Sequence, residues 1–216
     1  MLLGLVVVGA LFAWGRSGEP SKAGRAPALG LMATTDTTPD PLAVRGRRFV
    51  IPRNYFRYPP ELDPEAKGGF LLRVLLPNME PFAPATTAAF NAPGHGRKMN
   101  ILVEDRRTVL PLPDLLEVTL EGRPLDPPSA ATHGLAHARM PDNDDDLYVG
   151  RQANEIEPYI RCRPVRPDMG SSCDHRFEWG LLDVKLGYGR EHLPRWREIQ
   201  DRVVMLLKSF EALSNQ

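Results

Sequence analysis

Prolines constrain this chain more than any other feature of its sequence. The 216 residues include 22 prolines, about a tenth of the chain and roughly twice ordinary usage. A proline inside a helix removes a backbone hydrogen bond and clashes with the preceding turn, and a proline in a central strand interrupts the ladder. The chain therefore cannot form a long-helix bundle or a coiled coil, and we expect short strands joined by turns.

The overall composition is that of a folded protein without a strong charge preference. Hydrophobic residues make up 42% of the chain, and 27 basic residues balance 27 acidic ones. The hydrophobic fraction is close to what a packed domain needs and above what disorder implies. Because the net charge is zero, no long-range positive field attracts nucleic acid, and we expect no nucleic-acid partner.

Residues 1–15 are predicted to be a signal peptide or an N-terminal membrane anchor. The run from Leu2 to Trp14 carries no charge, and as a helix it would extend about 20 Å, less than a hydrocarbon core of about 30 Å. That length is typical of a signal-peptide core. The first basic residue, Arg16, follows the run instead of preceding it, which argues against a simple cleaved signal. A cleaved signal, a retained anchor and a buried element of the domain are the alternatives.

The rest of the chain is divided into a tether and one domain. Residues 16–46 are rich in Gly, Pro, Ser, Thr and Ala without a hydrophobic period, so little apolar area offsets the entropy of ordering them. We predict a disordered tether there and a single α+β domain over residues 47–213. With the leader, this arrangement predicts a protein that is periplasmic, or anchored in the inner membrane and facing the periplasm.

Short apolar or alternating segments predict about six to eight strands in an antiparallel or mixed sheet. An example is the apolar run from Gly69 to Leu76, which ends at Pro77. The stretch from Pro124 to Pro141 is weakly periodic and is predicted to be a long loop. The candidate strands are 47–51, 69–76, 97–103, 115–120, 147–149, 158–163, 175–179 and 182–188.

One amphipathic helix is predicted near the C-terminus, beginning at Pro194. Apolar residues recur there at three- and four-residue spacing, and the opposite face mixes acidic and basic side chains. Mixed charge is typical of a helix that covers a sheet, whereas a membrane-surface helix has a more uniformly basic face. The apolar positions are Trp196, Ile199, Val203, Leu206, Leu207 and Phe210.

Cys162 and Cys173 are the only cysteines, and they flank a turn-rich decapeptide between two predicted strands. In an oxidising compartment we expect a disulfide that closes this loop. Closing about 12 residues contributes about 3 kcal/mol on the chain-entropy model. The alternative is a catalytic thiol, in which Cys173 lies beside His175 on one strand face. The second cysteine and the compartment favour the disulfide.

Two histidines close to an acidic run suggest a metal site. His133 and His137 are four residues apart, and Asp142 and Asp144 follow as possible further ligands. Neutral imidazoles and carboxylates are ordinary zinc ligands, and two histidines at this spacing share one helix face. Gly134 weakens the hypothesis, because glycine disfavours the helix that the spacing requires.

The run from Asp142 to Asp146 has other interpretations. An EF-hand loop needs glycine at its sixth position and an acid at its twelfth, but the residues there are Leu147 and Ala153. A solvated acidic loop facing the basic stretch around Arg161 is the alternative that we prefer, and some other calcium site stays open.

The stretch from Pro52 to Gly69, with Pro52 included, combines four prolines with three aromatic rings, those of Tyr55, Phe56 and Tyr58. We predict an ordered loop in which these rings offer a rigid contact surface to a partner protein, since rigid aromatic side chains lose little entropy on binding.

Two short patterns carry a resemblance to a group of proteins. They are Ile51-Pro52-Arg53-Asn54-Tyr55 and Leu193-Pro194-x-Trp196-x-x-Ile199. In both, the chain resembles small envelope proteins of Gram-negative bacteria. The resemblance implies an N-terminal leader, a tether and one α+β domain in the cell envelope, and it implies no activity.

These observations favour a binding or accessory protein of the cell envelope, of the toxin-immunity or assembly-factor type. No nucleophile elbow, P-loop or dinucleotide fingerprint occurs in the sequence, and such motifs mark the commoner enzyme classes. We therefore predict a protein partner, no cofactor, and membrane association only through an uncleaved N-terminal segment. The alternatives are a metal-dependent hydrolase that uses His133, His137 and an aspartate from 142–146, and a purely structural envelope component.

Overall fold

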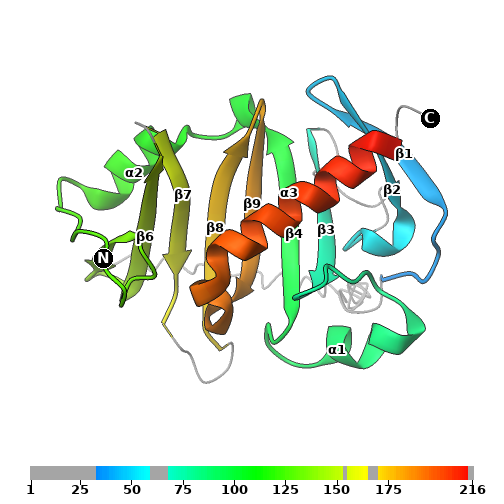
Figure 1. Cartoon of the computed structure of the whole chain (residues 1–216), viewed down its shortest axis with the longest axis horizontal. Coiled ribbons are helices and arrows are strands. Elements are labelled where there is room, and N and C mark those ends of the chain that lie inside the picture. Colours follow the sequence, from blue (N-terminus) through cyan, green and yellow to red (C-terminus); the bar gives the residue numbers. More distant parts are fainter. Residues whose placement is uncertain (1–32, 59–67, 153–154, 165–169, 214–216) are drawn as a thin grey trace, which may run out of the picture.

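The structure is a computed structural model that describes residues 33–58, 68–152, 155–164 and 170–213. It is an α+β fold built on a seven-stranded antiparallel sheet of order β3-β4-β9-β8-β7-β6-β5 (Figure 1), which confirms the predicted fold class. Five consecutive strands form a meander, and a β3–β4 hairpin extends it beyond β9. The strands are β3 (Gly69–Leu75), β4 (Lys98–Asp105), β5 (Ala136–Met140), β6 (Asp145–Gln152), β7 (Glu155–Cys162), β8 (Ser172–Trp179) and β9 (Leu182–Gly189).

A separate two-stranded hairpin precedes the main sheet. Strand β1 (Pro39–Val44) pairs with β2 (Arg47–Pro52), and the two residues between them, Arg45 and Gly46, both have positive φ, as a type I′ turn requires. The predicted strand at 47–51 is thus present, but it pairs outside the main sheet. Strand β1 lies within the predicted disordered tether, so part of that segment, Pro39–Val44, has regular structure. Residues 16–32 lie outside the described residues.

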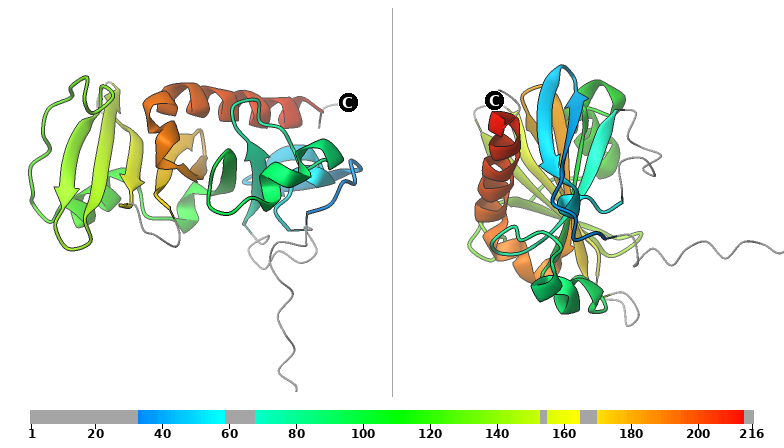
Figure 2. Two further views of the ribbon diagram at one scale, coloured as in Figure 1. Left: turned by 90° about the horizontal axis from the view of Figure 1, so that it is seen from below. Right: turned by 90° about the vertical axis from the view of Figure 1, so that its right-hand side faces the viewer.

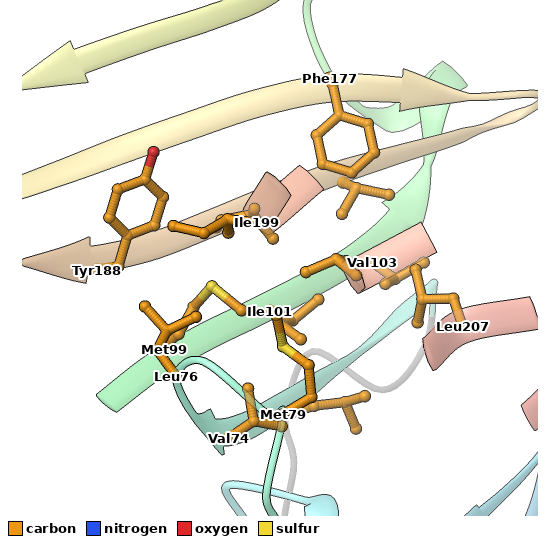
Figure 3. Close-up of a cluster of buried hydrophobic side chains, with 14 of the residues drawn as sticks. Val74, Leu76, Met79, Met99, Ile101, Val103, Phe177, Tyr188, Ile199 and Leu207 are labelled. Carbon is orange, nitrogen blue, oxygen red and sulfur yellow. The ribbon is translucent and has the colours of Figure 1, made fainter. Parts of the chain in front are cut away.

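The C-terminal helix α3 (Trp196–Leu213) crosses one face of the sheet (Figure 1). Its apolar stripe is buried, with Val203 and Leu207 fully inaccessible, and Figure 3 shows Leu207 and Ile199 beside the inward side chains of β4. The amphipathic helix is confirmed, although it begins at Trp196, because Arg190–Arg195 form the 3-10 segment η5. Such tight turns are common at helix N-termini.

The other face of the sheet carries the shorter helix α2 (Leu112–Leu120), and Figure 2 shows α2 and α3 on opposite sides. This helix corrects the strand predicted at 115–120. Leu112 and Leu116, one helical turn apart, are buried against β5–β7, and the C-terminal residue Glu121 adopts the left-handed conformation before Gly122. A helical spacing of leucines therefore outweighs the local strand-like alternation.

Strand β5 corrects the loop predicted from Pro124 to Pro141. Its residues Ala138 and Met140 are buried with α2, and its outer edge is partly covered, because Asp126 pairs with His137. Phe56 makes an equivalent bridge to Leu72 at the β3 edge. Covered edges limit unwanted strand pairing with other chains.

The remaining short elements are η1 (Arg53–Tyr55), η3 (Pro84–Thr86), α1 (Thr87–Asn91) and η4 (Arg106–Thr108). Across the described residues, no helix combines the length and the apolar character needed to cross a membrane. The predicted leader, residues 1–15, lies outside the described residues.

Candidate functional site

Asp146 lies at the centre of a polar cluster at the β5–β6 end of the sheet. It sits on the α3 side of β6, is 3% exposed, and pairs in register with Arg139 of β5. Its carboxylate accepts hydrogen bonds from His137 Nε2 at 3.0 Å, Arg139 Nη1 at 3.2 Å and Arg190 Nη2 at 2.5 Å. Burial by itself raises the pKa of Asp146, but these hydrogen bonds outweigh burial, and the pKa is lowered. The carboxylate is therefore ionised and fully engaged.

Tyr148 continues this cluster along the same face of β6, because side chains two residues apart point to one side of a strand. Its hydroxyl accepts a hydrogen bond from Arg190 Nη2 at 3.1 Å. Its ring lies 4.9 Å from the ring of His137 and 6.5 Å from that of His133. The backbone carbonyl of His133 in turn accepts a hydrogen bond from Trp196 Nε1 of α3 at 3.2 Å. The cluster thus reaches from β5 to the first turn of α3.

A groove of about 600 Å³ separates α3 from strands β6 and β7. Gly150 lies at its floor, and a side chain is excluded there, since a Cβ would approach the Glu157 carbonyl oxygen to 2.3 Å. We call this feature the β6 groove. It is lined by Gly134, Leu135, Gly150, Glu157, Trp196, Arg197, Gln200, Asp201, Val204, Met205 and Lys208.

A hydrogen-bond chain that starts in the core and ends at the groove holds the helical wall of the β6 groove in place. The Tyr188 hydroxyl donates to His175 Nδ1 at 3.1 Å, and His175 Nε2 donates to Gln200 Oε1 at 3.0 Å. Gln200 Nε2 then donates to Glu157 Oε1 at 2.6 Å across the groove floor. Burial lowers the pKa of His175 to about 4, so the imidazole is neutral near pH 7. This histidine joins α3 to the sheet and does not face the groove as a base.

The structure does not assemble the predicted metal ligands. His137 donates to Asp146, and His133 lies against Tyr148, while Asp142 pairs with Arg123 at 3.6 Å and Asp144 with Arg139 at 3.3 Å. Among the residues that the structure describes, no group of three or more His, Cys, Asp or Glu side chains could hold a metal ion. The spacing assumed a helix at 133–137, but His133 and Gly134 have positive φ and His137 belongs to a strand.

The acidic run is also less solvated than expected. Asp145 and Asp146 are buried at the start of β6, because both are paired with guanidinium groups. The predicted link to the basic stretch does exist, since Arg161 Nε donates to Asp145 Oδ2 at 2.6 Å.

The aromatic residues predicted to contact a partner pack mainly within the protein itself. Phe56 is 5% exposed and belongs to the main core, so it offers no contact surface. The Tyr55 ring packs edge-on against Phe210 of α3 at 5.0 Å. Tyr58 is half-buried, and the Arg57 guanidinium lies 5.2 Å from its ring centre. Tyr55 and Tyr58 are both partly exposed, so their contact with a partner stays a prediction.

The predicted disulfide between Cys162 and Cys173 is present. The two residues are register partners on the adjacent strands β7 and β8, and both are fully buried. The bond therefore fixes the pairing of β7 with β8 beside the Asp146 cluster, since Cys162 is also the register partner of Asp146. With both sulfurs in the bridge, the alternative of a catalytic thiol is wrong.

Sequence reasoning missed the groove because its parts are far apart in the chain. Arg190 reaches Asp146 over 44 residues, and Gln200 reaches Glu157 over 43. The one local signal is that Asp146 and Tyr148 are two residues apart. This spacing could have indicated that the acidic run continues into a β-strand with both side chains on the same face.

No protein-family model matches the sequence, and no curated protein matches it. Two solved structures share its fold. Smlt3025, an immunity protein of the Stenotrophomonas maltophilia type IV secretion system, has a TM-score of 0.59 at 19% identity, covering 81% of this chain and 93% of its own. FrpD, an iron-regulated outer membrane lipoprotein of Neisseria meningitidis, has a TM-score of 0.55 at 16% identity, covering 84% and 96% respectively. At these identities, what the three chains have in common is the fold.

Proposed function

We propose that this protein is a non-enzymatic envelope protein of the immunity type, which neutralises a toxic partner protein by binding it at the β6 groove. The partner would insert side chains between α3 and strands β6 and β7. Function in this proposal comes from surface complementarity, and the buried polar network keeps that surface rigid in advance of binding.

The outer face of α3 carries this proposal. Met205 is 60% exposed at the wall of the groove, and the charged side chains of Arg197, Asp201 and Lys208 surround it along the same wall. An apolar centre within a charged rim is the usual anatomy of a protein–protein interface. Arg197 also lies over the Trp196 ring at 4.7 Å, and Arg and Trp are enriched among residues that dominate binding energy.

Two further observations support the envelope setting. The disulfide between Cys162 and Cys173 is of the kind that persists in oxidising compartments. The fold is shared with a secretion-system immunity protein and an outer membrane lipoprotein.

A competition assay tests this function. Cells that lack the protein are mixed with their parent on a solid surface, and we expect their recovery to fall at least tenfold relative to liquid co-culture. Wild-type protein restores survival, whereas Met205→Glu does not, because it places a charge at the apolar centre of the groove wall. The matched control is Val118→Glu, since Val118 is 66% exposed on α2, on the opposite face. Equal recovery of deleted and parental cells would contradict the proposal.

A further inference from the structure

Three basic side chains lie together on the sheet face opposite α3, at the β3 edge. Arg73 of β3 pairs in register with Asn100, and Lys98 lies two residues from Asn100 on the same side of β4. The backbone N–H of Arg57 donates to the Leu71 carbonyl at 3.1 Å, and Phe56 forms a bridge with Leu72, so Phe56 and Arg57 lie alongside β3 at the edge of the sheet. We call Arg57, Arg73 and Lys98 the basic patch.

The basic patch has no acidic counterpart in the part of the chain that the structure describes. Arg73 Nε donates to the neutral amide oxygen of Asn100 at 3.1 Å, and the Lys98 ammonium donates to the Ala92 carbonyl. Arg57 Nε is buried and has no hydrogen-bond partner. Elsewhere on this face guanidinium groups have carboxylate partners, as Arg163 does with Asp174 at 2.9 Å.

Like charges at this density, without an acidic partner among the described residues, are costly to the free protein. Burial lowers the pKa of Arg73, and the nearby charge of Arg57 lowers it further. Burial and the charge of Arg73 likewise lower the pKa of Lys98. Groups held in such unfavourable surroundings cluster at functional sites, where a ligand relieves the repulsion.

We propose that the basic patch binds an extended acidic segment of a partner protein. This second surface lies on the opposite side of the sheet from the β6 groove and goes beyond the function proposed above. Arg57 lies opposite Leu71 and Lys98 opposite Leu75, so they are about 13 Å apart along the strands and about 10 Å apart across them. The patch therefore runs diagonally over about 16 Å, and alternate side chains of an extended segment lie about 7 Å apart. Carboxylates at alternate positions therefore reach several of the cations, whereas one phosphate group meets only part of the row. The adjoining Arg57–Tyr58 pair belongs to residue types enriched in interfaces.

Fluorescence anisotropy of the full chain with a labelled ten-residue peptide of alternating Glu and Ser tests this proposal. We expect saturable binding that weakens at least fivefold in Arg73→Gln and between 20 and 150 mM salt, since the contacts are ionic. The matched control is Lys208→Gln, which removes one positive charge from the α3 face and should change the affinity less than twofold. No binding, or equal loss in both variants, would overturn the proposal.

Two competitors separate the sources of negative charge. Inorganic phosphate and phosphatidylglycerol vesicles are added at the same charge concentration as the peptide, and neither is expected to displace it. Displacement by phosphate or by vesicles would reject an acidic protein segment as the ligand. The Met205→Glu variant should bind the peptide normally, so failure at one surface is distinguishable from failure at the other.

The thermal unfolding temperature gives a second test, because the direction of its change distinguishes repelling charges from side chains that stabilise the fold by packing. Removing one of the crowded cations in Arg57→Gln should raise Tm by roughly 1–3 °C, because repulsion is relieved. A fall in Tm would assign Arg57 a packing role and overturn the proposal.

Discussion

On the face that α3 covers, inward side chains such as Ile101 and Leu186 are fully buried, whereas on the opposite face strands β9 and β8 carry Lys185 and Arg176. Figure 2 shows that each face has its own helix, but α2 is half the length of α3 and covers only the β5–β7 end. The α3 face thus supplies most of the hydrophobic core. The other face has room for charged side chains that are satisfied in pairs.

This difference shows how one sheet can separate stability from recognition. Apolar burial is non-directional and grows with area, so the α3 face tolerates little change. Among the described residues of the opposite face, some charged groups form ion pairs, as Arg163 does with Asp174 and Arg176 with Asp183, and for the basic patch we propose an acidic ligand. The β6 groove lies on the α3 face, between α3 and strands β6 and β7.

The sharpest test of the comparison is the same substitution made on both helices. We expect Leu207→Ala in α3 to lower the free energy of unfolding by about 3–4 kcal/mol, and Leu116→Ala in α2 by about 2 kcal/mol. Leu207 is fully buried in the large cluster, whereas Leu116 is 5% exposed in the small one, so its cavity is relieved more easily. Urea denaturation measures both values, and equal losses would mean that the two faces contribute alike.

A buried ion pair makes the second test. Arg176 Nε lies 2.5 Å from Asp183 Oδ1, and both side chains are almost inaccessible. Burial raises the pKa of Asp183, and removing the carboxylate leaves a buried guanidinium without its partner. Asp183→Asn should therefore lower the free energy of unfolding by about 3 kcal/mol. A loss below about 1 kcal/mol would show that this pair behaves as a surface pair.

The pH dependence of stability isolates His175 on the α3 face. Above pH 6.5 its imidazole is neutral in the folded and unfolded states. Between pH 6.5 and about 4 the unfolded chain takes up a proton that the folded protein excludes. Stability is therefore lost as the pH falls, by about 2 kcal/mol at pH 5 from this group. In His175→Gln the fall between pH 7 and pH 5 should shrink by that amount, and an unchanged fall would contradict the assignment.

The smallest effect is expected for an exposed ion pair on the face opposite α3. Arg163 and Asp174 are 2.9 Å apart, but their side chains are 54% and 32% exposed. Solvent screens such a pair, so Asp174→Asn should change the free energy of unfolding by less than about 0.5 kcal/mol. A loss close to that of Asp183→Asn would remove the distinction between buried and exposed charges on this face.

Helices and strands with a long or unambiguous pattern of hydrophobic residues could be predicted from the sequence. Helix α3 and the apolar strand β3 have such patterns, and the disulfide followed from two cysteines at the ends of one loop. Helix α2 was mistaken for a strand, because Leu115 to Leu120 alternates locally while its helical leucines begin three residues earlier, at Leu112. Strand β5 was missed because it is only five residues long and two of its three apolar residues are small alanines, so its alternation of apolar and polar residues is a weak signal within a turn-rich stretch.

The candidate site was less predictable than the fold, for a physical reason. Sequence reasoning picked out His133 and His137, but their role depends on Tyr148 and on Arg190 of η5, which only the tertiary structure brings to them. Hydrogen-bond partners separated by more than forty residues leave no local pattern. The basic patch was missed for the same reason, since three separate segments supply its charges.

Site-specific photo-crosslinking in living cells tests the central claim most directly. A benzoylphenylalanine at position 205, on the wall of the β6 groove, should give one discrete adduct with an envelope or secreted protein, and the purified partner should then bind Met205→Glu at least tenfold more weakly than wild type. The same photoreactive residue at position 118, equally exposed on α2, should give no such adduct. Identical adducts from both positions, or none from position 205, would contradict recognition through the β6 groove.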